Sequence, residues 1–494
     1  MRELRPIRQL RGARGAFPRT RAGRIDFEGR IDRGGGLMAP AAAPAGAQPA
    51  ADAHAPRERG HARVHARRAP PPLEHRILMT ATLCLLAFGA VMVYSASAPL
   101  GVLAGSGNGT GEFVRYLVFG AAGLAAMYLL ERRGLELLRP RLVNVLLLGS
   151  FVLLALVLVP GFGVVVSGAR RWFAAGPIQF QPSELMKLAL VLYVAGHLAR
   201  HPKRMRSFRE AVAPIAVTLG PACLLIVVEP DLGTALVVAF SIAALLVSAG
   251  MPARYLAALG LLAGVLVIAL VAAQPYQSAR LTSFLHPWSL ASNGGYQAVQ
   301  GQIALGSGGL LGVGLGRSVQ KVFYLPEAQT DYILAVIGEE LGVLGIFGVV
   351  FLYGMIAYAG LRTARRAAGR YAKLVAAGLT SLILCQGILN IFVVLGLAPL
   401  TGVPLPFISY APTNLCVMLA AVGLLLNIAR PGGGRLRAVD AGGTGVWRRG
   451  SATHRRAAVG RGAATRDAGA DRDRRRRDRR ARRAGAGGRG RATR

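Results

Sequence analysis

Runs of about 20 apolar residues recur along the middle of the chain and limit the possible folds more than any other feature of the sequence. A helix of that length crosses the hydrocarbon core of a bilayer, and a helix satisfies its own backbone polar groups there. The pattern predicts an all-α, polytopic membrane protein with about ten transmembrane helices and a long extracytoplasmic loop before helix eight. The predicted spans are 77–97, 113–131, 142–160, 182–199, 211–228, 232–250, 255–273, 332–360, 374–396 and 407–429.

The two ends of the chain have a different composition, rich in Arg, Gly, Ala and Pro and almost without aromatic residues. We expect residues 1–75 to be a disordered basic extension and residues 431–494 to be a disordered Arg-rich cytoplasmic tail, since neither can bury a core. Residues 76–430 then form the transmembrane core. The extension has no signal-peptide pattern, and translation from Met38 or another downstream start would shorten it.

The formal net charge of +36 suggests nucleic acid as a partner, but its concentration in two disordered ends argues against that class of protein. The basic run 472–483 suits anionic membrane lipids, and a solvated tail without a specific function is the alternative. The four cysteines stand alone in apolar runs, and no metal-ligand spacing is present.

Lys and Arg gather in alternate loops, which orients the chain in the membrane. The loops after predicted helices two, four and eight are basic, whereas the loops between them are nearly free of Lys and Arg. We therefore expect both termini in the cytoplasm and the segments 162–181 and 274–331 outside it. The range 296–305 has helix-like apolar spacing, so the long segment should form a packed outer subdomain with amphipathic helices at the membrane surface.

Four carboxylates stand in the stretch 325–340, LPEAQTDYILAVIGEE, where a polar segment meets a long apolar one. Acidic groups near hydrocarbon are costly, so each needs a structural partner or a chemical task. Glu339 and Glu340 lie inside predicted helix eight, and we interpret them as structural groups. Glu327 and Asp331 precede that helix and remain in the extracytoplasmic segment.

A second group of polar residues surrounds the start of predicted helix four. Glu184 and Lys187 are three residues apart, so they share a helix face and can neutralise one another. They form either a structural ion pair or the polar wall of a substrate cavity. Arg170 and Arg171 precede them, where they can face an anionic ligand. In the turn 229–233, EPDLG, the aspartate is suited to cap the helix that follows.

Two further segments have a distinctive composition. The stretch 306–316, GSGGLLGVGLG, resembles a phosphate-binding loop only superficially, because it lacks the GxGxxG and GxxxxGK[ST] patterns. The stretch 399–410, PLTGVPLPFISY, contains three prolines and predicts a rigid outer loop.

Five motifs in a fixed order give the chain the pattern of a known family, the SEDS proteins (shape, elongation, division and sporulation). The resemblance covers roughly residues 77–430, and the pairing of QKVFYLPEAQTD with AVIGEE is more similar to the FtsW branch than to the RodA branch. The motifs are SGARRWFAAGPIQFQPSELMKLALVLYVA, EPDLGTALV, GGYQAVQGQIALGSGGLLGVGLG, FYLPEAQTDYILAVIGEELG and PLTGVPLPFISY.

This resemblance implies a peptidoglycan glycosyltransferase that polymerises lipid II on the outer face of the bacterial cytoplasmic membrane during septal cell-wall synthesis. It implies a class B penicillin-binding protein and other divisome proteins as partners. The essential carboxylate of the family falls on Asp331, as a catalytic base. No cofactor is certain, and Mg²⁺ or Mn²⁺ is an option beside the departing pyrophosphate. The expected substrate-binding residues are Arg170, Arg171, Gln181, Glu184, Lys187, Glu327, Tyr296 and Ser409.

The chain departs from the family pattern at three places. Gln329 stands where the family usually has His, His286 stands where Asp is usual, and SYAPTNL at 409–415 replaces the usual SYGGSS, which places Pro412 where glycine would leave the backbone free. The alternative functions are a RodA-like elongation polymerase, a lipid II flippase or transporter, and a non-catalytic divisome scaffold. A transporter should show repeated halves with broken helices, and the sequence has no evident internal repeat.

Overall fold

A computed structural model describes residues 71–103, 109–137, 139–166, 169–176, 178–202, 208–292 and 294–430. The predicted basic extension and the Arg-rich tail lie outside the described residues, apart from 71–75, where the first helix begins.

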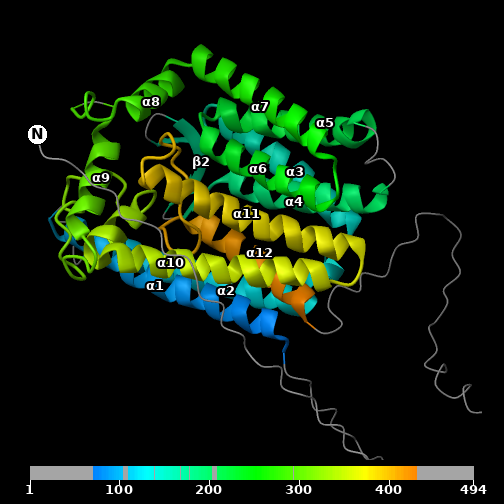
Figure 1. Cartoon of the computed structure of the whole chain (residues 1–494), viewed down its shortest axis with the longest axis horizontal. Coiled ribbons are helices and arrows are strands. Elements are labelled where there is room, and N and C mark those ends of the chain that lie inside the picture. Colours follow the sequence, from blue (N-terminus) through cyan, green and yellow to red (C-terminus); the bar gives the residue numbers. More distant parts are fainter. Residues whose placement is uncertain are drawn as a thin grey trace, which may run out of the picture. The chain divides into compact units, whose positions relative to one another are not determined.

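Ten long helices correspond one by one to the ten predicted spans, and they run side by side in Figure 1. Two shorter helices, α8 (Pro275–Leu285) and α9 (Tyr296–Gly308), lie in the long segment before predicted helix eight, and the apolar spacing of 296–305 predicted the second of them. The long helices are α1 (Leu73–Leu103), α2 (Gly111–Leu137), α3 (Pro140–Leu158), α4 (Pro182–Arg200), α5 (Phe208–Val228), α6 (Leu232–Ser248), α7 (Ala253–Ala273), α10 (Ile333–Arg366), α11 (Arg370–Val394) and α12 (Pro412–Ala429).

The lengths and hydropathies of these helices confirm a multi-pass membrane protein. In the described part of the chain, seven helices are long and apolar enough to cross a membrane, and α5 and α6 contain shorter apolar stretches. The helix α4 is 19 residues long but carries a charged pair inside it. The predicted all-α class is therefore confirmed, with the spans of α4, α5 and α6 less apolar or shorter than the rest.

A small antiparallel sheet interrupts the helical architecture between α3 and α4, and the sequence analysis did not predict it. Its strands are β1 (Val164–Val166), β2 (Ala169–Ala175) and β3 (Ile178–Phe180), in the order β1-β2-β3. The Val run of β1 has the β-branched side chains that favour strands, and Gly176 adopts a φ of 60° at the turn between β2 and β3. The predicted outer loop 162–181 is thus a folded hairpin region.

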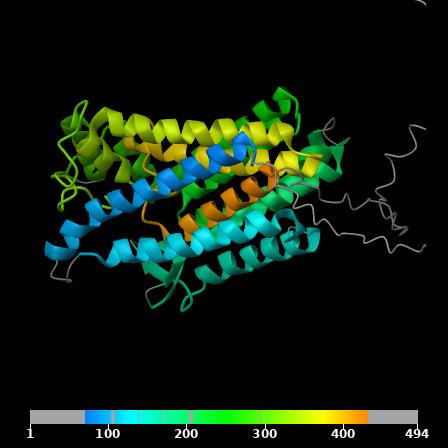
Figure 2. The ribbon, with the colours of Figure 1, turned by 90° about the horizontal axis from the view of Figure 1, so that it is seen from below.

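The core of the bundle forms around α4, α11 and α12, whose side chains are mostly buried. The helix α12 packs along α2, and α1 packs along α10, as Figure 2 shows. The close approach of α2 and α12 depends on small residues, since a Cβ at Gly423 would lie 2.5 Å from the carbonyl oxygen of Met127. In contrast, α7 has no buried residue and packs mainly against α6 and α8.

Two ends of the bundle can be distinguished by their connections. At one end, called the loop-rich end, lie the segments 159–181, 229–231, 274–332 and 395–411. At the opposite end, the start of α1 is held by ion pairs: Glu74 to Arg362 at 2.7 Å, and His75 to Glu131 at 2.7 Å. These pairs tie α1 to α10 and to α2 through carboxylates that are almost fully buried.

The helix α10 is broken near its start, and backbone groups of the Gly-rich segment 306–316 form hydrogen bonds with the backbone groups at the break. Gly342 has a φ of 67°, so the ladder of helical hydrogen bonds stops there. The amide of Val313 donates to the carbonyl of Glu339 (2.9 Å), and the amide of Val343 donates to the carbonyl of Gly309 (3.0 Å). A Cβ at Gly312 would lie 2.1 Å from the carbonyl oxygen of Glu340, so this contact requires glycine.

The side chains of Glu339 and Glu340 attach the next part of the loop to the same break. Glu339 accepts hydrogen bonds from the hydroxyl of Ser318 and from the amide of Val319 (2.9 Å). Glu340 forms an ion pair with Lys321 (2.6 Å) and accepts from Ser95 of α1 (2.7 Å). The interpretation of both glutamates as structural groups is confirmed, because every one of these bonds is made to the protein itself.

Replacing Lys321 with methionine should destabilise the fold. Lys321 and Glu340 are 1% and 0% exposed, and removing one partner of a buried pair costs about 3–5 kcal/mol because the other charge stays buried and unpaired. We expect a fall of that size in the free energy of unfolding, measured in mixed micelles. The double variant Lys321→Met, Glu340→Gln should recover part of it.

The exposed Lys373 at the opposite end supplies the matched control. Its substitution by methionine should change the free energy of unfolding by about 0.5 kcal/mol or less. Equal stabilities of the Lys321 and Lys373 variants would contradict the role given to the buried pair.

Candidate active site

The segments of the loop-rich end converge on the residues that precede α10. The amide of Tyr410 donates to the carbonyl of Gln329 (2.9 Å), which joins the α11–α12 connection to the α9–α10 connection. Arg171 of β2 donates from Nε to the carbonyl of Glu229 (2.7 Å), which joins the hairpin to the α5–α6 turn. Polar residues from four separate parts of the sequence therefore meet at one place.

Asp331 lies at the centre of this convergence, two residues before α10 begins. Its backbone carbonyl accepts a hydrogen bond from the side-chain amide of Asn390 (2.7 Å), and the same amide donates to the carbonyl of Val403 (2.8 Å). A Cβ at Gly402 would lie 3.3 Å from a carboxylate oxygen of Asp331, so the glycine leaves room for that group. The buried Asn390 thus fixes the position of Asp331 relative to the proline-rich loop.

The charges around Asp331 favour a carboxyl group that titrates near neutrality. Burial of the carboxyl group and then the negative charge of Glu327 raise the pKa of Asp331 to about 7. The positive charges of Arg280 and Arg171 act in the opposite direction, and Asp231 adds to the rise. A group with this pKa exchanges protons readily at physiological pH, as a general base must.

The α5–α6 turn places two acidic residues, Glu229 and Asp231, near Arg171. Asp231 caps α6, as its sequence position predicted, by accepting from the amide of Thr234 (3.0 Å), and it also accepts from Gln181 (3.1 Å). Glu229 is fully buried, and its carboxyl oxygens have no hydrogen-bond partner among the described residues. Burial and then the charge of Asp231 raise the pKa of Glu229 to about 9, so this group is protonated at pH 7.

Glu184 and Lys187 form a buried polar cluster inside the helical core. Their charged atoms lie 2.8 Å apart, and both side chains are almost fully buried. Lys187 also donates to Gln386 of α11 (2.7 Å), and Asn414 of α12 donates to Glu184 (2.7 Å). These contacts favour the structural ion pair of the two alternatives, since both charges are matched by protein groups.

The remaining predicted substrate-binding residues have different surroundings. Glu327 accepts from the hydroxyl of Thr330 (2.9 Å) and adopts a φ of 54° in the loop before Asp331. Ser409 is buried, and its hydroxyl accepts from the amide of Leu405 (2.8 Å). Arg170 lies in β2 opposite Val165, and Tyr296 begins α9. No contact of Arg170 or Tyr296 with Asp331 is present among the described residues, and their substrate roles stay predictions.

The three departures from the family pattern occupy ordinary structural positions. Pro412 is the first residue of α12, where a missing amide hydrogen costs nothing. His286 follows the last residue of α8 and caps it with its backbone. The backbone carbonyl of Gln329 accepts from Tyr410, and its side-chain amide donates to Glu112 (3.5 Å).

The sequence analysis missed Arg280 and Asn390. Arg280 belongs to α8, where its Nη1 donates to the carbonyl of Leu400 (3.3 Å) while its charge acts on Asp331. Asn390 is a single amide in the apolar sequence of α11, and such an isolated polar residue in a predicted span is the signal that could have identified it.

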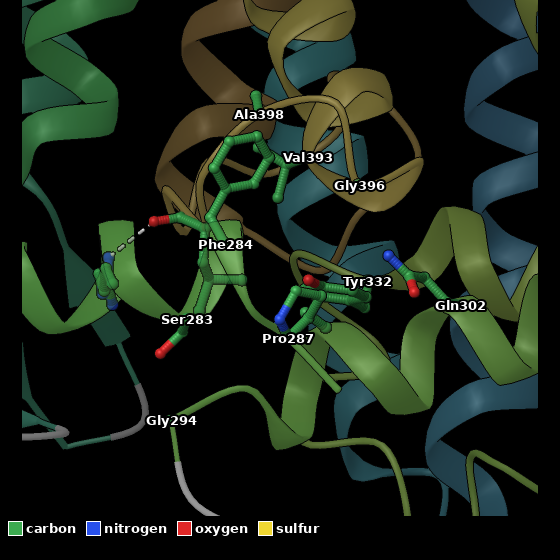
Figure 3. A pocket seen from close by; sticks show the side chains of 12 residues that line it. Ser283, Phe284, Pro287, Gly294, Gln302, Tyr332, Val393, Gly396 and Ala398 are labelled. Carbon is green, nitrogen blue, oxygen red and sulfur yellow. Dashed lines mark hydrogen bonds between the residues drawn. The ribbon is translucent and has the colours of Figure 1, made fainter. Parts of the chain in front are cut away.

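A small pocket opens beside Tyr332, the residue that follows Asp331 in the chain, between α8, α9 and the end of α11 (Figure 3). Its cavity has a volume of about 70 Å³. Arg280, Phe284, Gln302 and Tyr332 contribute its larger side chains, and backbone of the α11–α12 connection closes it. The pocket is therefore adjacent, through Tyr332, to the loop that carries Glu327 and Asp331.

The described side chains do not form a metal cage. No three His, Cys, Asp or Glu residues come together in the described ranges in the way that a metal ion requires. The described residues thus offer no cluster of three such ligands, and Mg²⁺ or Mn²⁺ stays a prediction.

Comparison with known proteins gives consistent similarities over the helical core. Residues 76–432 match the family of cell cycle proteins FtsW, RodA and SpoVE. The chain is 40% identical over 356 residues to stage V sporulation protein E of Bacillus subtilis (strain 168), which covers 72% of this chain and 96% of that protein. It is 38% identical over 355 residues to a probable peptidoglycan glycosyltransferase FtsW of Geobacter sulfurreducens, covering 72% and 94%.

A solved structure shares the fold as well. One chain of a peptidoglycan synthase complex, described as coordinating polymerization and crosslinking, is 30% identical in sequence with a TM-score of 0.57. The match covers 71% of this chain and 96% of that chain.

Replacing Asn390 with leucine should loosen the loop that carries Asp331. The substitution keeps the size of the side chain but leaves the carbonyls of Asp331 and Val403 without their donor, at about 1–3 kcal/mol for each buried group. We expect faster hydrogen exchange in 327–332 and 401–405, with exchange in α4 unchanged, measured by mass spectrometry. As a control, Gln297→Leu removes a half-buried amide bonded to Pro326 (3.2 Å) and should change neither segment. Parent-like exchange in the Asn390 variant would exclude the positioning role.

Proposed function

Because the chain belongs to the SEDS family of cell cycle proteins, we infer that it is a peptidoglycan glycosyltransferase that polymerises lipid II into glycan strands. The observation that carries this inference is Asp331, a carboxyl group with a pKa of about 7 at the point where the loops of the loop-rich end meet. Relatives that are 36–40% identical bear the name of this activity. Because these relatives are named FtsW, we favour a role in cell division over a RodA-like role in elongation.

The chemistry assigned to Asp331 is proton abstraction. A hydroxyl of the acceptor sugar attacks the anomeric carbon of the donor, a new C–O bond forms, and the bond from that carbon to the lipid pyrophosphate breaks with its electron pair. The Asp331 carboxylate takes the hydroxyl proton, which increases the nucleophilicity of the oxygen. The loop before α10 holds the carboxylate at the end of a membrane helix, where a lipid-linked sugar is accessible.

Stabilisation of the departing pyrophosphate requires positive charge near the same site. Arg171 and Arg280 supply it, since both act electrostatically on Asp331. Lys187, an expected substrate-binding residue, is instead enclosed by Glu184 and Gln386. A divalent cation such as Mg²⁺ or Mn²⁺ is proposed only as a companion of the substrate phosphates, which would supply the ligands that the chain lacks.

Partners and location follow from the same relationships. The structure of a synthase complex that coordinates polymerization and crosslinking supports a transpeptidase partner, and we propose a class B penicillin-binding protein together with other divisome proteins. The loop-rich end would face the outside of the cytoplasmic membrane at the division septum, with both termini in the cytoplasm. The Arg-rich tail would then contact anionic membrane lipids.

Three alternatives remain for the experiment to separate: a RodA-like role in elongation, a lipid II flippase or transporter, and a non-catalytic scaffold. Purified protein with its transpeptidase partner and labelled lipid II distinguishes the last two from the enzyme. Polymer formation supports the proposed function, translocation without polymer supports the flippase, and neither product supports the scaffold. Depletion in growing cells separates a division defect from an elongation defect.

Asp331→Asn should abolish polymerisation while leaving the fold intact. The amide keeps the shape of the side chain but cannot accept the hydroxyl proton, and loss of a general base reduces rates by about 10²–10⁴-fold. Glycan polymer from labelled lipid II is the readout, and the melting temperature in detergent is the check on folding. Glu210→Gln serves as the control, since it removes an exposed carboxylate at the start of α5, at the opposite end of the bundle. Polymerisation by the Asn variant at the parent rate would remove Asp331 from the mechanism.

The activity should rise with pH to a plateau, with a midpoint near pH 7. Asp331 acts as a base in its ionised form, and that form predominates above its pKa of about 7. In Glu327→Gln the loss of a negative charge lowers this pKa, so the midpoint of kcat/KM should move to lower pH. A midpoint near pH 4 in the parent, or one that Glu327→Gln leaves unchanged, would show that another group controls the rate.

A further inference from the structure

The pocket beside Tyr332 contains two side-chain polar groups, those of Tyr332 and Gln302, that have no hydrogen-bond partner among the described residues. Tyr332 is 1% exposed, lines the pocket, and its hydroxyl has no hydrogen-bond partner among the described residues. The side-chain amide of Gln302 likewise bonds to no described residue, and it lies against Gly396, where a Cβ would approach its nitrogen to 2.6 Å. The Tyr332 hydroxyl belongs to a buried residue, whereas Gln302 is half-buried, so both polar groups are open to the pocket and available to a polar ligand.

The other walls of the pocket are apolar or positively charged. Phe284 of α8 and Val393 of α11 provide hydrocarbon surface, and Arg280 provides the charge. The wall at Val393 and Gly396 is the C-terminal end of α11, the negative end of a helix dipole. That end opposes an anionic ligand such as phosphate, so a neutral group with both apolar and polar atoms fits the lining better.

The size of the pocket limits the ligand further. A cavity of about 150 Å³ holds benzene, so a cavity of about 70 Å³ has room for a group of a few heavy atoms but not for a sugar ring. An acetamido group has four heavy atoms: a methyl carbon, a carbonyl carbon, an oxygen and a nitrogen. Its oxygen can accept from Tyr332 or Gln302, its N–H can donate to the Gln302 oxygen, and its methyl group can contact Phe284 and Val393.

We propose that this pocket binds the 2-acetamido group of the acceptor sugar and thereby selects N-acetylated hexosamines. The inference rests on the proposed function and adds the specificity of its acceptor site. Tyr332 follows Asp331 directly in the chain, and its ring packs on Gly301 of α9, where a Cβ would lie 2.5 Å from the ring. An acetamido group held here would therefore keep the neighbouring hydroxyls of its sugar next to the Asp331 carboxylate.

The test compares two acceptors and three variants in lipid II polymerisation. One acceptor is natural lipid II, and the other carries a 2-hydroxyl in place of the 2-acetamido group on the sugar with the attacking hydroxyl. The variants are Tyr332→Phe, which removes only a hydroxyl, Gln302→Met, which keeps the length of the side chain, and Gln297→Met as the control. Gln297 is a half-buried amide of the same helix α9 that lies outside the pocket lining.

We expect the parent and the Gln297 variant to prefer the natural acceptor in kcat/KM by tenfold or more. Tyr332→Phe and Gln302→Met should each lower kcat/KM for the natural acceptor by about tenfold, the effect of one lost hydrogen bond, and leave the 2-hydroxyl acceptor unaffected. Equal losses on both acceptors would overturn the proposal. So would a parent enzyme without a preference, a result that does not depend on the folding of any variant.

The failure of this inference is distinct from failure of the proposed function. A parent that polymerises lipid II but does not distinguish the two acceptors overturns only the acetamido site. A parent that forms no polymer from natural lipid II, in the presence of its partner, overturns the transferase assignment and the acetamido site together. An N-butanoyl acceptor adds a second measurement, because two extra carbons exceed the room in the pocket and should lower kcat/KM in the parent.

Discussion

The broken helix α10 is the constraint on which the arrangement of the loop-rich end depends. Backbone groups freed at Gly342 cannot stay unsatisfied within an apolar bundle, and the glycine-rich segment supplies their partners one by one. Because the same segment is held by Glu339 and Glu340, the loop that follows it enters the site in a defined path. The hydrogen bonds of Glu339 and Glu340 therefore help to position the loop that ends at Asp331, together with the bond from Asn390. None of these groups takes part in proton transfer.

The helical framework was predictable because the need to cross hydrocarbon imposes length and composition on each span. The ten ranges and the structural role of Glu339 and Glu340 follow from that need, and the helical spacing of 296–305 predicted α9. The sheet β1–β3 was not predictable in the same way, because three-residue strands lack the alternation that identifies longer ones. Its Val residues also read as part of the preceding apolar run.

The site was predictable at the level of single residues but not of their partners. Asp331 was identified by resemblance, whereas Arg280 and Asn390 become significant only when α8 and α11 are placed beside the loop. Glu184 and Lys187 illustrate the reverse, because helical spacing predicted their pairing but not Gln386 and Asn414, which complete it from distant helices. Contacts between remote segments depend on the packing of whole helices, and local sequence patterns do not encode it.

The exposure of α7 has a consequence for how the sequence can diverge. None of its side chains is buried and most are exposed, so selection acts on them mainly for hydropathy and helix length rather than for shape. Exchanges among Leu, Val, Ile and Ala along 253–273 should accumulate freely between related chains, while the closely packed faces of α2 and α12 tolerate little change. Among members of the family, the sequence of α7 should then diverge faster than the sequences of the other helices.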